Sequence, residues 1–267
     1  MVKIDRKIVL RKHLFNLHDY SLILASFFFY VSDAVVIIPT YNEIENVERM
    51  TRTVMAFNKD FHILYVDDNS PDGTAEKIEE LQLEFPNRIF LEKRPGKMGL
   101  GTAYIHGFKW AIKNEYDFVF EMDCDFSHNP EDLIRLYNAC AIDGADVSIG
   151  SRYCKGGKVK NWPIKRILMS YFASLYVRLI LLIGIKDTTA GFKCYRRKVL
   201  EAIDLDSIPF KGYAFQICMK YAAIRLKFRV TEVPITFIDR QYGTSKMSSG
   251  IFKEAFFGVW RMRFMKF

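Results

Sequence analysis

The chain alternates between short apolar runs and longer stretches with helical spacing. The first apolar run, 34–39 (AVVIIP), is too short for a helix and rich in β-branched residues, so it predicts a buried strand. Similar runs predict further strands at 62–67, 88–92, 118–122 and 147–150, and the segments between them predict helices at 42–57, 73–85, 102–114 and 130–141. Strands that alternate with helices of this length predict right-handed βαβ units and a mostly parallel α/β sheet.

The two ends of the chain and one stretch of its second half are amphipathic. The stretch 166–185 carries only two charged residues, and the stretch 251–267 mixes aromatic with basic residues. Each pattern is typical of a helix that lies in a membrane interface, and equally of one that packs on the domain. Basic residues precede the apolar run 20–31, which is about half of the ~20 residues that a spanning helix needs. We therefore expect an N-terminal extension at 1–33, one domain at 34–250 and an amphipathic segment at 251–267. The extension would either pack against the protein or serve as an interfacial anchor.

The composition indicates a globular protein but does not identify its binding partner. Half of the 267 residues are hydrophobic and 26% are charged, which suits a globular domain with a sizeable core. The formal net charge of +8 suits an anionic partner, whether nucleic acid, a phosphorylated substrate or an acidic membrane. Five cysteines without a CxxC pair support neither a zinc site nor a disulfide framework, and favour a reducing compartment.

Acidic residues follow two of the predicted strands. Asp67 and Asp68 come after the second strand, and Asp123 and Asp125 after the fourth. Because ligands of parallel sheets bind at the carboxyl ends of the strands, we expect these carboxylates to meet at one edge. Two carboxylates two residues apart suit Mg²⁺ or Mn²⁺, although an acidic turn that caps the next helix would have the same pattern.

Two other classes of enzyme fit the sequence less well. The glycine pair in the segment 99–101 comes after the third predicted strand rather than the first and lacks a third glycine, so it is weak evidence for a dinucleotide site. A phosphatase of the haloacid dehalogenase type would open its domain with a DxD motif and place paired aspartates later, whereas this chain has the reverse order.

Several motifs occur in a fixed order along the chain. They are PTYNE (39–43), DDNSPDGT (67–74), GLGTAYIHGF (99–108), DCDFSH (123–128), SRY (151–153), AGFKCYRR (190–197), KGYAFQ (211–216) and EVPITFIDRQYGTSK (232–246). Together they resemble the family 2 glycosyltransferases and, among these, the dolichol-phosphate mannose synthases. The resemblance covers residues from about 34 to 250 and is far more specific than any one motif.

The resemblance implies a GT-A fold, which is a Rossmann-like, mostly parallel sheet flanked by helices. It also implies inverting transfer of mannose from GDP-mannose to dolichyl phosphate. Residues implied to hold the guanosine are Pro39, Tyr41, Glu43, Val66 and Asp68. Residues implied to meet the diphosphate and a Mg²⁺ or Mn²⁺ ion are Asp123, Cys124 and Asp125, with Ser127 as a further metal ligand where relatives have Gln.

The basic second half is implied to complete the reaction. Arg240 and Lys246 resemble a loop that closes over the donor phosphates, and with Asp125 and Arg152 they are the expected catalytic residues. Arg152, Arg166 and Ser170 are implied to hold the acceptor phosphate. Since a lipid phosphate is already anionic at neutral pH, we expect no general base.

The resemblance also implies partners and a location. These are a membrane surface, with small membrane-anchoring subunits as a further option, and no nucleic acid. The location is the cytosolic face of the endoplasmic reticulum membrane or another cytoplasmic membrane surface. With a lipid acceptor, we expect the stretches 166–185 and 251–267 to form amphipathic helices in the membrane interface. The alternatives left open are another nucleotide sugar and a catalytically silent GT-A subunit that binds lipid.

Overall fold

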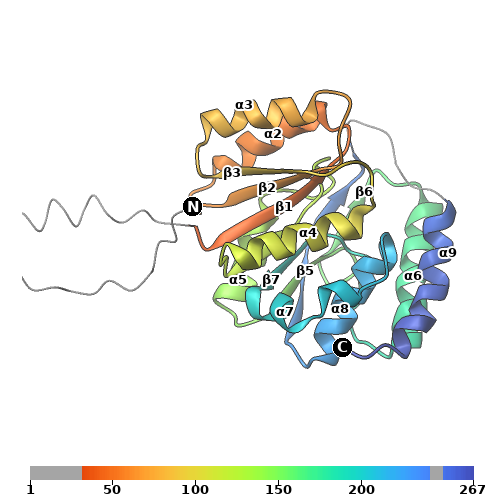
Figure 1. Cartoon of the computed structure of the whole chain (residues 1–267). Helices are drawn as coiled ribbons and strands as arrows, with labels where there is room; N and C mark the ends of the chain where they lie inside the picture. Colours follow the sequence, from red (N-terminus) through yellow and green to blue (C-terminus); the bar gives the residue numbers. More distant parts are fainter. Residues whose placement is uncertain (1–31, 241–248) are drawn as a thin grey trace, which may run out of the picture. The chain divides into compact units, whose positions relative to one another are not determined.

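The computed structural model describes residues 32–240 and 249–267 (Figure 1). A seven-stranded sheet has the order β3-β2-β1-β4-β7-β5-β8, in which β7 runs antiparallel to both neighbours and all other pairs are parallel. Its strands are β1 (Ala34–Thr40), β2 (His62–Asp67), β3 (Ile89–Lys93), β4 (Phe118–Glu121), β5 (Val147–Ser151), β7 (Lys193–Arg196) and β8 (Val230–Pro234). A second, two-stranded parallel sheet joins β6 (Lys158–Lys160) to β9 (Thr236–Ile238).

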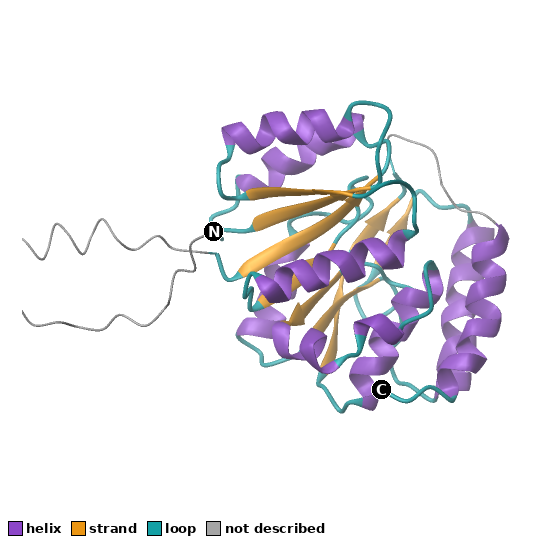
Figure 2. Cartoon of the chain, in the orientation of Figure 1, coloured by secondary structure: helices purple, strands orange, loops and turns teal. Residues whose placement is uncertain are grey.

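Helices cover both faces of the large sheet (Figure 2). The apolar sides of three helices form one core with the sheet: α2 (Ile44–Met55), α3 (Thr74–Glu84) and α5 (Asp132–Ala141). The core on the other face takes side chains from α4 (Leu100–Lys113), α6 (Ile164–Leu181), α7 (Arg197–Ala202), the 3₁₀ turn η1 (Leu205–Ser207), α8 (Tyr213–Arg225) and α9 (Ser249–Arg263).

Strand β1 shows why the apolar runs form a two-faced sheet. Successive side chains of a strand point to opposite faces. Accordingly, Val35 and Ile37 belong to one core, while Val36 and Ile38 belong to the other, and all four are fully buried. A continuous apolar run is therefore required wherever helices cover both faces.

Glycine allows α4 to approach β1 closely. A Cβ atom on Gly107 would lie 2.6 Å from Ile37 Cγ2, and one on Gly101 would lie 2.7 Å from the carbonyl oxygen of Phe210. Real Cβ atoms do not approach other atoms this closely, so the glycines of this segment serve helix packing. This agrees with the sequence, which gave only weak evidence for a dinucleotide site here.

Helices α6 and α9 lie side by side at the edge of the domain (Figure 1). Tyr176 of α6 stacks on Phe256 of α9 with ring centroids 4.9 Å apart, and its hydroxyl donates to the Phe256 carbonyl oxygen at 2.9 Å. Their outer surface exposes large apolar side chains: Ile164, Leu168, Met169, Tyr171, Phe172, Leu179, Phe256, Phe257, Trp260 and Phe264, which we call the apolar face of α6 and α9. Within the described ranges, no helix is both long and apolar enough to cross a membrane.

The mostly parallel sheet flanked by helices is confirmed, and the predicted strands and helices of the first 150 residues all occur within a few residues of their expected ends. The patterns did not predict β6, β7, β8, β9, α7 or α8. The divisions at 33 and 250 stay predictions, because residues 1–31 and 241–248 lie outside the described part.

Candidate active site

A cavity of about 400 Å³ lies at the carboxyl ends of β1, β4 and β5, within the usual size range of ligand sites. Residues from segments far apart in the chain form its wall. Those that the sequence had singled out are Pro39, Tyr41, Glu43, Asp68, Asp123, Cys124, Asp125, Ser127, Arg152, Arg166 and Arg240. The structure therefore gathers the acidic strand ends and three of the predicted cationic residues around one space.

The turn after β4 holds Asp123 and Asp125 in place. Phe126 has a φ of 59°, a left-handed conformation that is uncommon for an aromatic residue. This conformation lets the backbone N–H of Ser127 donate to Asp125 Oδ1 at 3.0 Å. The guanidinium of Arg49 lies 4.3 Å from the centre of the Phe126 ring and covers it. The strained turn thus presets the direction of the Asp125 carboxylate.

His128 supports the same turn through a hydrogen bond to its backbone. Its Nδ1 accepts from the backbone N–H of Asp123 at 3.5 Å, and its ring stacks on Phe192 with centroids 5.0 Å apart. Burial lowers the pKa of His128 to about 4, so the ring is neutral at physiological pH and carries its proton on Nε2. It is suited to positioning the turn rather than to accepting a proton in a reaction.

The two carboxylates of the turn are electrostatically strained without a cation. Asp123 is only partly buried, with 40% of its side chain exposed. Its desolvation in the cavity wall, followed by the nearby charge of Asp125, raises its pKa to about 7, while Arg240 opposes the shift. Arg240 Nη2 lies 3.3 Å from Asp125 Oδ2 and supplies the positive charge at this point. The site therefore favours binding of a cation.

The donor set fits a Mg²⁺ or Mn²⁺ ion that is shared with a phosphorylated ligand. Such ions use one or two carboxylates and complete their coordination with phosphate oxygens and water. Asp123 and Asp125 supply the carboxylates, and Ser127 lines the same wall. Among the described residues, no three His, Cys, Asp or Glu side chains are grouped to hold a metal by themselves.

The paired aspartates after β2 have different roles. Asp67 is fully buried and accepts hydrogen bonds from Thr40 Oγ1 at 2.8 Å and Ser70 Oγ at 2.6 Å, so it shapes the loop. Asp68 lines the cavity, but its Oδ1 also accepts from Arg94 Nε at 2.6 Å. Arg94 therefore orients Asp68, and the sequence patterns did not reveal it.

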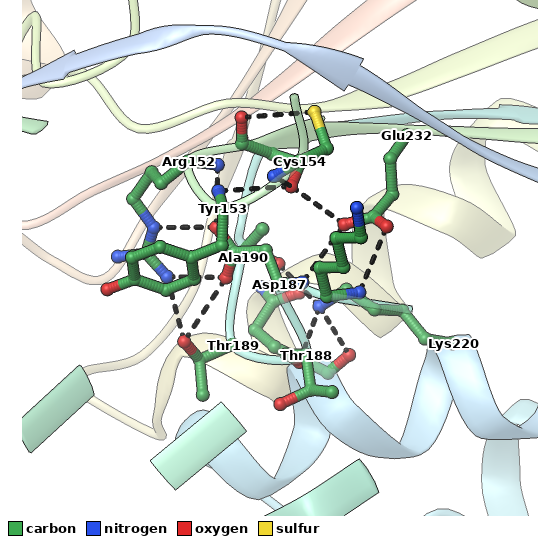
Figure 3. A network of polar contacts seen from close by, with 12 residues as sticks. Arg152, Tyr153, Cys154, Asp187, Thr188, Thr189, Ala190, Lys220 and Glu232 are labelled. Atoms are coloured by element: carbon green, nitrogen blue, oxygen red, sulfur yellow. Dashed lines mark hydrogen bonds and ion pairs between the residues drawn. The ribbon is translucent and has the colours of Figure 1, made fainter. Parts of the chain in front are cut away.

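A network of buried charges supports the cationic side of the cavity (Figure 3). Asp187 accepts from Arg152 Nε and Nη2, both at 2.7 Å, and Thr189 Oγ1 accepts from the same Nη2 at 2.8 Å. Asp187 is fully buried. No described residue accepts from Arg152 Nη1, which leaves that nitrogen for a ligand oxygen.

Arg166 is held less rigidly than Arg152. Its guanidinium lies 4.0 Å from the centre of the Trp162 ring, and its Nη1 lies 3.1 Å from Asp239 Oδ1. About a third of each side chain of this ion pair is exposed. Arg152 approaches the same indole at 5.6 Å, so Trp162 lies between the two cations on the cavity wall.

Two predicted site residues do not line the cavity, and the position of a third is not described. Val66 is fully buried in the core, so its side chain cannot reach a nucleotide bound there. Ser170 lies one turn beyond Arg166, but α6 contributes only its first turn to the wall. Lys246 falls in the segment 241–248, outside the described residues.

The cavity also contains polar residues that the sequence did not single out: Lys97, Trp162, Thr189, Lys211, Tyr213 and Gln216. Lys211 and Gln216 fall in the KGYAFQ motif, so the motif drew attention to the segment but not to these side chains. Lys97 lies 5.0 Å from the centre of the Tyr41 ring. No local spacing signal would have found Lys97, because it sits in a loop without periodicity.

The chain is similar in sequence to known mannosyltransferases and related proteins. The chain is 49% identical over 231 residues to a polyprenol monophosphomannose synthase of Mycolicibacterium smegmatis, covering 86% of this chain and 87% of the relative. It is 46% identical over 227 residues to an undecaprenyl-phosphate mannosyltransferase of Micrococcus luteus, covering 85% and 92%.

Solved structures share the fold at low sequence identity. A glucosyl-3-phosphoglycerate synthase from Mycobacterium tuberculosis, crystallised with Mn²⁺, UDP and phosphoglyceric acid, has a TM-score of 0.64 at 14% identity, covering 96% of this chain and 85% of that one. A mannosyltransferase from Pyrobaculum calidifontis, crystallised with GDP-Man and Mn²⁺, has a TM-score of 0.53 at 13% identity, covering 88% and 70%. These matches confirm the GT-A type of fold.

The sequence profile of the family described as glycosyl transferase family 2 matches residues 35–204, which span β1 to α7 and include the Asp123–Asp125 turn. With this match and two relatives above 45% identity, the chain belongs to glycosyl transferase family 2.

Proposed function

We propose that this protein transfers a mannosyl group from GDP-mannose to a polyprenyl phosphate, with inversion at the anomeric carbon. The observation that carries the proposal is the arrangement of the cavity. Its wall contains two carboxylates, Asp123 and Asp125, and also two guanidinium groups, Arg152 and Arg166. An acidic site suits a metal-bound diphosphate, and a neighbouring cationic site suits a second phosphate. The names of the two sequence relatives support mannose and a polyprenyl phosphate.

On the donor side, Asp123, Asp125 and Ser127 would hold the Mg²⁺ or Mn²⁺ ion. When bound, the ion acts as a Lewis acid that stabilises the negative charge of the departing diphosphate. Arg240, which lies beside Asp125, would turn toward the diphosphate once the cation neutralises that carboxylate. Tyr41, Glu43 and Asp68 would contact the nucleoside. Further proposed contacts to the nucleotide sugar come from Pro39, Cys124 and Lys246.

On the acceptor side, the guanidinium groups of Arg152 and Arg166 would hold the lipid phosphate near the anomeric carbon. Guanidinium suits phosphate because it donates parallel hydrogen bonds in a fixed plane. The phosphate oxygen attacks the anomeric carbon as the bond to the diphosphate breaks. Since this oxygen is already anionic, the neutral His128 has no proton to accept.

The apolar face of α6 and α9 would bring the enzyme to the membrane that contains the acceptor. Arg166 lies in the first turn of α6, and Leu168, Phe172 and Leu175 follow it along the same helix. A lipid whose phosphate is held by Arg166 would lay its chain along these residues. Aromatic side chains exposed on α9 suit the headgroup region of a bilayer. Membrane-anchoring subunits and a location on the endoplasmic reticulum stay predictions.

A thermal-shift panel of GDP, UDP and ADP, each with and without Mn²⁺, tests the donor site. A ligand that binds only the folded state stabilises it by ~2.7 kcal/mol at a hundredfold excess over Kd. We expect GDP with Mn²⁺ to raise the Tm and the Asp125→Ala variant to abolish the metal-dependent part. If UDP raises the Tm and GDP does not, the donor is another nucleotide sugar. If no nucleotide raises the Tm, the chain is a silent lipid-binding subunit.

A further inference from the structure

Gln216 presents an unpaired hydrogen-bond donor in the cavity wall. It lies in the first turn of α8 and is 2% exposed, and its Nε2 has no hydrogen-bond partner among the described residues. A buried amide without a partner is costly, by roughly 1–3 kcal/mol, unless a ligand or water satisfies it. Because Gln216 is part of the cavity wall, a bound ligand can satisfy it.

A buried ion pair fixes which end of the amide faces the ligand. Lys193 of β7 donates to Gln216 Oε1 and lies 3.0 Å from Glu121 Oε1, and Lys193 and Glu121 are both fully buried. A lysine ammonium can only donate hydrogen bonds. Turning the amide over would place its NH₂ group against the ammonium, so the oxygen must face Lys193 and the nitrogen must face away from it. The direction in which the Nε2 hydrogen-bond donor points is therefore fixed before a ligand binds.

A second buried lysine ties the helix of Gln216 to the loop before Gly191. Lys220, one turn further along α8, donates to the carbonyl oxygens of Thr188 at 2.8 Å, Ala190 at 2.7 Å and Gln216 at 3.1 Å. Figure 3 shows how this ammonium joins α8 to the loop that also carries Asp187. The loop leads directly into Gly191, so Gly191 and Gln216 keep a fixed separation.

The missing side chain of Gly191 leaves room at this donor. A methyl group built on Gly191 would lie 3.8 Å from Gln216 Nε2 and 3.7 Å from His128 Cε1, which are ordinary van der Waals distances. Gly191, Gln216 and His128 therefore surround a small polar corner of the cavity. The backbone of Gly191 does not have a positive φ, so its lack of a side chain matters for space rather than for conformation.

We propose that Gln216 is a specificity-determining residue that donates, through Nε2, to a hydroxyl of the donor sugar. The cavity already has guanidinium groups for the phosphates, at Arg152, Arg166 and Arg240. A neutral amide suits a neutral hydroxyl, and a site built to pair with a hydroxyl discriminates strongly against a sugar that lacks it. This inference rests on the proposed function, because it takes the ligand to be a nucleotide sugar.

Two variants remove the interaction in different ways. Gln216→Met deletes the donor at similar length and leaves Lys193 paired with Glu121. Gly191→Ala keeps Gln216 and its contact to Lys193, and fills the corner with a methyl group that the fold can accept. Gly184→Ala is the matched control, since a Cβ there meets nothing within 4 Å.

The experiment is calorimetric binding of GDP and of GDP-mannose, each with Mn²⁺, to the wild type and the three variants. We expect Gln216→Met and Gly191→Ala to weaken GDP-mannose binding by about tenfold, the effect of one hydrogen bond, with GDP binding unchanged. Monodeoxy analogues of GDP-mannose then identify the hydroxyl. One analogue should bind the wild type about tenfold more weakly and should lose nothing further in Gln216→Met.

Unchanged GDP-mannose binding in both variants would overturn the assignment of Gln216. Equal losses for GDP and GDP-mannose would overturn it as well, because Gln216 would then serve the nucleotide or the fold. The proposed function fails by a different result, which is a wild-type protein that binds neither GDP nor GDP-mannose.

Discussion

Removing the carboxylate of Asp187 should destabilise the protein far more than removing that of Asp239. Both residues pair with an arginine of the cavity, but Asp187 is fully buried with Arg152, whereas the pair of Asp239 and Arg166 is about a third exposed. Breaking a buried pair leaves an uncompensated charge and costs about 3–5 kcal/mol. Exposed pairs contribute about 0.2–1 kcal/mol. Asp187 also accepts a hydrogen bond from the backbone N–H of Arg152 at 2.9 Å, which adds to the free-energy cost of removing its carboxylate.

The free energy of unfolding can be compared by urea denaturation of the wild type, Asp187→Ala and Asp239→Ala. For a chain of this size 1 kcal/mol corresponds to about 2–4 °C in Tm, so thermal melting should show a loss of roughly 6–20 °C for Asp187→Ala and at most about 4 °C for Asp239→Ala. Asp187→Asn should fall between the two, because it keeps an acceptor but not the charge. Similar losses for Asp187→Ala and Asp239→Ala would refute the reasoning, since burial would then not set the energy of these pairs.

Three further predictions concern the cavity and the membrane. Because the pKa of Asp123 is raised to about 7, protons should compete with the metal, and Mn²⁺ affinity measured by calorimetry should fall about tenfold per pH unit below 7 and level off above it. In the metal-free protein the stability contribution of Asp123 has the opposite sign, being present at low pH and lost as the pH rises through about 7. Arg166→Ala should raise the KM for a polyprenyl phosphate about tenfold and leave GDP affinity unchanged; equal changes in both would place Arg166 in the donor site or the fold. Phe172→Asp or Trp260→Asp should reduce cosedimentation with anionic vesicles without changing GDP binding, whereas Leu83→Asp, on the exposed side of α3, should not.

The sequence predicted those parts of the fold whose signal is local. The apolar run of β1 is dictated by burial on both faces, so its pattern alone is sufficient. Strand β7 was missed because it reads KCYR, and its first residue is a lysine whose burial depends on partners elsewhere in the chain, among them Glu121, 3.0 Å away on the neighbouring strand. A pairing between residues 72 positions apart leaves no periodic trace in the sequence.

The active site, like the fold, was predicted only where the signal in the sequence is local. The Asp123–Asp125 turn follows from its place after a strand, and the motif order pointed to Tyr41, Asp68 and Arg240. The partners that fix these groups come from remote segments: Asp187 for Arg152, Asp239 for Arg166 and Arg94 for Asp68. Helical spacing suggested that Ser170 would share a phosphate with Arg166. Spacing alone, however, does not predict which turns of a helix line a cavity, and here only the first turn of α6 does.

The central claim is most directly tested by transfer of radiolabelled mannose. Purified protein is incubated with GDP-mannose, Mn²⁺ and undecaprenyl or dolichyl phosphate in detergent, and the lipid extract is counted. We expect a mannosyl lipid to form together with an equal amount of GDP, and Asp125→Ala to abolish this transfer. The acceptor that is used better identifies the natural lipid. Transfer from UDP-glucose but not from GDP-mannose, or undiminished transfer by Asp125→Ala, would contradict it.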